Sequence, residues 1–242
     1  MNFVNKIRGR FQNFIGFEKL NPLNNFDFHN SFDESNLISN IDLFKKAMEE
    51  HNELKEVIWI SLYHCLNTFD AKIEYLTVLD INFQLIADLV EGNEEKVIIP
   101  DSVKQEILEG NVLATFHNHF NGAIIPSSKD LKNTILPFVK FMVITSENNI
   151  GIIVNDTNCD SKLLKQEWIF FLAYVNWSFN ITFASEIEKI YALKLNDEKF
   201  KKQEEILFNR FLSLNLKKFI NEFNSRMEKY NVYFLYITIL EE

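Results

Sequence analysis

The tripeptide His-Asn-His at residues 117–119 is the strongest chemical signal in the sequence. It ends the apolar stretch 112–119, whose composition predicts a β-strand. Side chains two residues apart in a strand point to the same face, so His117 and His119 can present both imidazoles to one metal ion. Ser127 and Asp130 follow at the start of an expected helix, from which the Asp130 carboxylate can return toward the histidines.

Two imidazoles and one carboxylate suit a catalytic zinc site, which has three protein ligands and leaves the fourth position for water. Zinc lowers the pKa of such a water molecule to about 7, which supplies a nucleophile at neutral pH. We therefore predict that His117, His119 and Asp130 bind one Zn²⁺. Ser127 is then placed to donate a hydrogen bond to the oxyanion that forms when a carbonyl is attacked.

Hydrolysis also needs a general base to accept the proton of the water. We assign this role to Glu56, because it starts the apolar stretch 56–65, which predicts a strand directly after a helix. Glu53 and Glu74 remain open as alternatives, since both lie upstream of the histidines and not far from Glu56 in the sequence.

The pattern His-x-His, seven residues, Ser, two residues, Asp, with an upstream Glu, resembles the JAMM motif of the JAB/MPN metalloprotease family. The resemblance is closest to the RadC-type bacterial branch, on the wording His-Asn-His, Gly122, Pro126-Ser127, Asp130 and Thr134. It covers residues 36–156 and implies the roles given above, with ubiquitin-like conjugates or precursors as substrates. Phe120 departs from the family, which usually has proline after the second histidine.

The elements expected around the motif make an α/β fold, with a mixed sheet flanked by helices and a mainly helical C-terminal extension. Helices are expected over 37–48, 101–110 and most of 161–229. Strands are expected over 56–65, 72–80, 81–90, 112–119, 140–147, 150–156 and 232–240. The expected domains are a basic aromatic N-terminal arm and linker (1–35), a JAMM/MPN-like metalloprotease domain (36–156) and a helical C-terminal region ending in a strand (157–242).

Composition argues against several other functions. The net charge of -9 disfavours nucleic acid as a partner, and with it an HNH nuclease, whose defining residues are in any case spread over a ββα finger. Two distant cysteines without a secretory start predict a reduced, cytoplasmic protein. The charge-free run 168–185 is near the minimum length of a membrane span, but its internal Asn, Ser and Thr side chains favour a buried helix.

The alternative to a protease or peptidase acting on a protein substrate is a non-catalytic MPN-like assembly module. The aromatic C-terminal region favours it, because an apolar helical stripe and the apolar stretch 232–240 are surfaces through which homo- or hetero-oligomers form. The stripe consists of Phe200, Leu207, Phe211 and Leu214.

Overall fold

The structure is a computed structural model that describes residues 38–39, 41–68, 71–93, 97–119, 124–125, 139–146, 149–156, 161–193 and 195–238. The N-terminal arm, Cys159 and the stretch that contains Ser127 and Asp130 lie outside these residues.

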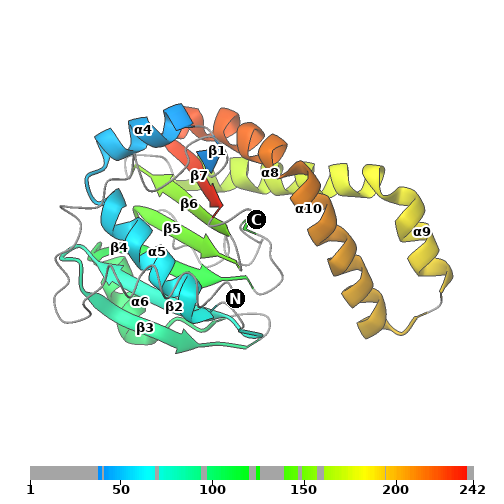
Figure 1. The fold of residues 1–242 in the computed structure, drawn as a ribbon, viewed down its shortest axis with the longest axis horizontal. Helices are drawn as coiled ribbons and strands as arrows, with labels where there is room; N and C mark the ends of the chain where they lie inside the picture. Colours follow the sequence, from blue (N-terminus) through cyan, green and yellow to red (C-terminus); the bar gives the residue numbers. More distant parts are fainter. Residues whose placement is uncertain are drawn as a thin grey trace, which may run out of the picture.

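A seven-stranded sheet, in the order β1-β7-β6-β5-β4-β2-β3, forms the centre of the molecule (Figure 1). Its strands are β1 (Ile38–Ser39), β2 (Tyr75–Asp80), β3 (Leu85–Glu91), β4 (Val112–Asn118), β5 (Phe141–Thr145), β6 (Asn149–Asn155) and β7 (Val232–Thr238). Among these, β4 and β5 pair in parallel, and the other neighbours pair antiparallel. The predicted α/β class with a mixed sheet is confirmed.

Helices α4 (Ile41–Glu50) and α5 (Leu54–Thr68) cover one face of the sheet (Figure 1). Leu54, Val57 and Ile58 of α5 are buried in one cluster with Phe116 of β4 and Val143 of β5. Full burial of each such side chain contributes about 1.5–3 kcal/mol, so α5 is held mainly by its contact with the sheet.

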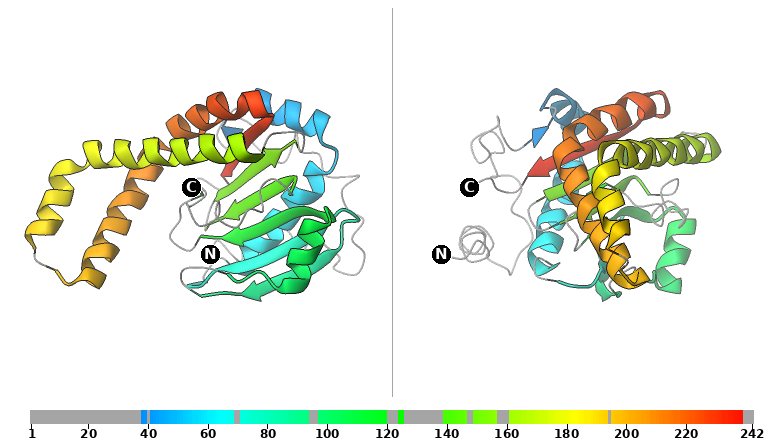
Figure 2. Two further views of the ribbon diagram at one scale, coloured as in Figure 1. Left: turned by 180° about the vertical axis from the view of Figure 1, so that it is seen from behind. Right: turned by 90° about the vertical axis from the view of Figure 1, so that its right-hand side faces the viewer.

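The opposite face is covered by α6 (Asp101–Leu108), α8 (Ser161–Thr182) and α10 (Asp197–Met227), with α9 (Ala184–Ala192) further out and η3 (Glu228–Tyr230) leading into β7 (Figure 2). Trp168 and Phe171 of α8 both meet the Phe223 ring of α10 edge to face, at centroid distances of 5.2 and 5.3 Å. Through these ring contacts α8 and α10 pack against each other over β5, β6 and β7. Figure 2 shows α9 and the adjoining ends of α8 and α10 extending beyond the sheet.

The charge-free run 168–185 lies mainly in α8, as the polar groups within it predict. None of the helices in the described part of the chain is long and apolar enough to cross a membrane. Trp168, Phe171, Val175 and Phe179 are instead buried in the core between α8, α10 and the sheet.

The C-terminal strand β7 lies inside the sheet, between β6 and β1. It pairs with β6 over its whole length and with β1 at Tyr236 and Ile237. Region 157–242 therefore contributes a strand and many core residues to the same sheet as region 36–156.

Two expected elements differ in the structure. The stretch 56–65 is part of helix α5, so the strand prediction is wrong. The β-branched and aromatic residues of this stretch are typical of a strand. Its buried positions, however, recur every three or four residues, which is the period of a helix. The helix expected over 37–48 begins only at Ile41, because Ile38 and Ser39 pair with β7.

Candidate metal site

The two histidines of the His-Asn-His motif face each other at the end of β4. Their Nε2 atoms lie 3.2 Å apart, and their ring centroids lie 5.0 Å apart. Both residues are buried, each 8% exposed. The structure thus brings the two imidazoles to one point, as their spacing in a strand predicts.

This separation fits a shared zinc ion. In a tetrahedral site with Zn–N distances of about 2.0–2.1 Å, neighbouring nitrogens lie about 3.3 Å apart. The same distance also fits an N–H···N hydrogen bond between neutral rings, with one Nε2 protonated. The two donor nitrogens are therefore close enough together to share one metal ion.

The third ligand cannot be placed from the described residues. Within them, no group of three or more His, Cys, Asp or Glu residues is arranged to hold a metal ion. Asp130 and Ser127 lie outside these residues, so their roles as ligand and oxyanion donor stay predictions.

Glu56 lies in the first turn of α5, at the far end of the sheet from the histidines. The neighbouring Glu53 pairs with Lys140 at 2.9 Å, just before β5 begins. At the other end of the helix, the Cys65 thiol donates to the Ser146 carbonyl, just after β5 ends. Cys65 is nine residues beyond Glu56, which is about 13 Å along a helix. Because β4 and β5 are parallel, Glu56 lies near the start of these strands and the histidines lie at their end.

Glu56 is also on the other face of the sheet. Helix α5 packs on Phe116, and the side chain of the next residue, His117, points the opposite way. The assignment of the base to Glu56 depended on a strand that does not exist, and we correct it: the structure does not bring Glu56 or Glu53 to the histidine pair.

Glu74 is the candidate base that the sheet places beside the pair. Leu76 of β2 is directly opposite His117 of β4 in the antiparallel register. Continuing this register by two residues puts Glu74 opposite His119 and on the same face. The Glu74 N–H donates to the Asn93 carbonyl at 3.0 Å, and the Glu74 carbonyl accepts from Gly92 at 2.8 Å. Half-buried Glu74 is thus fixed to the β3 side of the sheet.

Another buried histidine, His64 of α5, lies behind the site on the opposite face. Its Nδ1 is 3.0 Å from the Thr77 hydroxyl of β2, and its ring lies beside Phe116. Burial, with a smaller contribution from the nearby His117, lowers the pKa of His64 to about 3, so the ring is neutral at neutral pH.

Backbone that follows the histidines packs closely on β6. Ile124 and Ile125 are buried on the same face as the pair. A Cβ atom at Gly151 of β6 would lie 2.6 Å from the ring of Phe234 and 3.2 Å from the Ile124 carbonyl oxygen. Only glycine leaves room for this approach.

We therefore expect Gly151→Ala to lower the free energy of unfolding by about 1–3 kcal/mol, the usual cost of an extra methyl group in a packed core. Urea unfolding of the wild type and the variant measures this difference. An unchanged midpoint would show that the buried Phe234 ring moves aside without cost.

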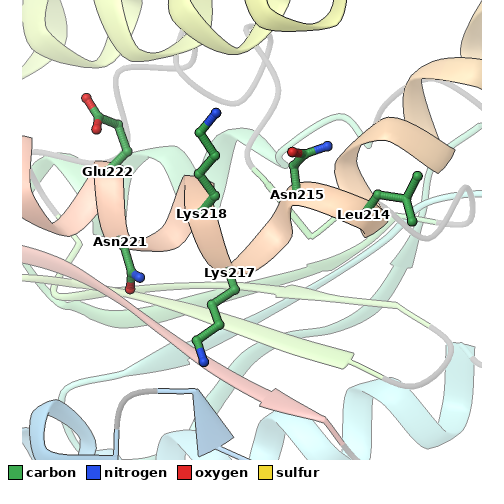
Figure 3. Close-up of a pocket in the computed structure, with 6 residues that line it drawn as sticks. All are labelled: Leu214, Asn215, Lys217, Lys218, Asn221 and Glu222. Atoms are coloured by element: carbon green, nitrogen blue, oxygen red, sulfur yellow. The ribbon is translucent and has the colours of Figure 1, made fainter. Parts of the chain in front are cut away.

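Two hollows in the described surface lie away from the histidines. One, of about 630 Å³, is lined by Leu214, Asn215, Lys217, Lys218, Asn221 and Glu222, all of α10 (Figure 3). Figure 3 shows Lys217 and Lys218 pointing to opposite sides of the helix, so its cations do not converge on one ligand. The histidine pair is therefore the site with the clearest chemistry in the described part of the chain.

The chain was also compared with known proteins. No model of a protein family, no curated protein and no solved structure matches it.

Proposed function

We propose that the protein is a zinc-dependent hydrolase of peptide or isopeptide bonds, with His117, His119 and Asp130 as metal ligands and Glu74 as the general base. The observation that carries the proposal is the buried histidine pair, whose Nε2 atoms are separated by the edge length of a tetrahedral zinc site. The resemblance of the motif to the JAMM pattern supports the same chemistry.

Each residue then has a defined task. His117 and His119 would hold the metal through Nε2, with their protons on Nδ1. Held there, zinc would supply Lewis-acid activation of the substrate carbonyl and of the attacking water molecule. Glu74 accepts the proton that the water loses and transfers it to the amine nitrogen as the C–N bond breaks. Ser127 donates a hydrogen bond to the oxyanion formed during the attack.

The motif resemblance supports a substrate among ubiquitin-like conjugates or precursors. The proposal also keeps the cytoplasmic location that the cysteine usage predicts.

A non-catalytic assembly module is the second candidate, and an observation on α8 favours it. Phe170, Trp177 and Ile181 are each about 60% exposed on this helix, and exposed apolar surfaces of this kind mark protein interfaces. The strand β7, expected to offer an edge to a partner, pairs on both sides within the sheet, so an interface would involve the helices instead.

Zinc content separates the two candidates. Protein produced with ample zinc is expected to contain about one zinc per chain, measured by elemental analysis. Combining His117→Ala with Asp130→Ala should weaken zinc affinity more than about 100-fold, which exceeds the usual effect of losing a residue that only supports a ligand.

The matched control is the combination of His51→Ala and Asp156→Ala, a histidine and an aspartate that lie together at the opposite end of the sheet. This control should keep its zinc. Metal-free wild-type protein would favour the assembly module.

A further inference from the structure

Asn118, the central residue of the motif, bridges two peptide groups of the neighbouring chain segment. Its Oδ1 accepts a hydrogen bond from the Tyr75 N–H at 2.6 Å, and its Nδ2 donates to the Ile73 carbonyl at 3.0 Å. These two groups lie on either side of Glu74. Asn118 is only 2% exposed, and its partners Ile73 and Tyr75 are half-buried, so the two bonds are partly shielded from bulk water.

The side-chain amide takes the place of backbone pairing at this point. Strand β4 ends at Asn118, and the N–H of the next residue, His119, donates to the Thr145 carbonyl of β5 at 2.8 Å. The described pairing between β2 and β4 begins at Leu76. Beyond that residue, the Asn118 amide joins the Glu74 segment to β4.

We infer that Asn118 is a positioning residue for Glu74, holding this carboxylate across from His119. The inference rests on the proposed function. Glu74 is fixed to β3 through its own N–H and carbonyl and to β4 through the Asn118 amide, so both sides of its backbone are constrained. A general base must be held within about 0.5 Å of its working position, and this bridge supplies that constraint on the β4 side.

The task requires an amide in particular. An ionised aspartate of the same size can accept from Tyr75 but cannot donate to Ile73, and alanine can do neither. Either change leaves a half-buried backbone group without this partner, which favours separation of the two segments.

Asn224 of α10 offers a matched control. Its Oδ1 accepts from the Phe234 N–H at 2.6 Å, and its Nδ2 donates to the Phe234 carbonyl at 3.1 Å. It makes the same pair of bonds as Asn118, but to β7 rather than to β2. Asn224→Ala should therefore lose a comparable amount of stability and leave the site unchanged.

The test measures binding of acetohydroxamate to the zinc-loaded full-length protein by titration calorimetry. This small chelator binds zinc through two oxygens, one of which forms a hydrogen bond with a neighbouring carboxylate. Glu74→Gln is expected to weaken binding about 10- to 100-fold, since it removes a charge-assisted hydrogen bond. Asn118→Ala should weaken it about 10-fold, and Asn224→Ala should change it less than twofold.

The double variant distinguishes positioning of Glu74 from general damage. If Asn118 acts through Glu74, adding Asn118→Ala to Glu74→Gln weakens binding no further. A further 10-fold loss in that background, or an Asn118→Ala effect no larger than that of Asn224→Ala, would overturn the inference. Two other outcomes would refute the proposed function instead: a wild-type protein that binds no zinc, or a Glu74→Gln variant that binds acetohydroxamate as tightly as the wild type. Should Asn118→Ala fail to give a cooperative melt, Asn118→Asp takes its place with the same expectations.

Discussion

Glu74→Gln is expected to leave zinc bound and to lower the rate of hydrolysis about 10²- to 10⁴-fold, the range typical for loss of general acid–base catalysis. Glutamine keeps the shape of the side chain but cannot accept a proton at neutral pH. Continued by two residues beyond the Leu76–His117 pair, the register of β2 against β4 brings this residue across from His119, on the face where both imidazoles meet. Turnover of ubiquitin-like conjugates and of a quenched-fluorescent peptide library, with zinc content measured in parallel, gives the comparison.

Glu56→Gln is the control for this experiment. Glu56 is on α5, on the other face of the sheet and at its other end, so this variant should hydrolyse at the wild-type rate. Full turnover in Glu74→Gln would remove Glu74 as the base. Loss of turnover in Glu56→Gln alone would show that the helix reaches the site after all.

Acid is expected to destabilise the fold through His64. In the unfolded chain this imidazole titrates near its ordinary pKa of 6.5, whereas burial lowers the pKa to about 3 in the folded state. Between these two values the unfolded chain binds a proton that the folded chain does not. The free energy of unfolding therefore falls as pH is lowered from 6.5 toward 3, at a slope approaching about 1.4 kcal/mol per pH unit, and this contribution is complete above 6.5.

Urea unfolding at a series of pH values measures that slope, and His64→Gln provides the comparison because its side chain does not titrate. The interval from pH 6.5 to about 5 is the most informative, since most carboxylates titrate lower. His51, whose pKa is also lowered by burial and then by Lys140, adds a slope of the same sign in both proteins. Equal slopes in wild type and His64→Gln would contradict the expectation.

The strands and the histidine pair could be predicted because they depend on local patterns. β2, β4, β5, β6 and β7 are short apolar stretches rich in β-branched residues, and each was expected within a few residues of its observed bounds. His117 and His119 meet because alternate residues of a strand share a face, a rule that needs no knowledge of neighbouring strands.

The base could not be assigned from sequence for the opposite reason. Choosing between Glu56 and Glu74 requires the order of strands and their register, which are set by packing far along the chain. The stretch 56–65 carries apolar side chains around most of the helix, and this removes the contrast between a helical and an alternating pattern. The role of Asn118 could not be predicted from sequence either, since its hydrogen-bond partners Ile73 and Tyr75 lie more than 40 residues earlier.

The place of β7 in the sheet has a consequence for biosynthesis. Its long partner, β6, leaves the ribosome well before it, and α8, α9 and α10 are made in between. Until β7 emerges, β6 has one side without hydrogen-bonding partners, and its sequence from Ile150 to Val154 is almost entirely apolar. Such a nascent chain exposes a surface prone to pairing with other chains, and it is the kind of intermediate that chaperones shield.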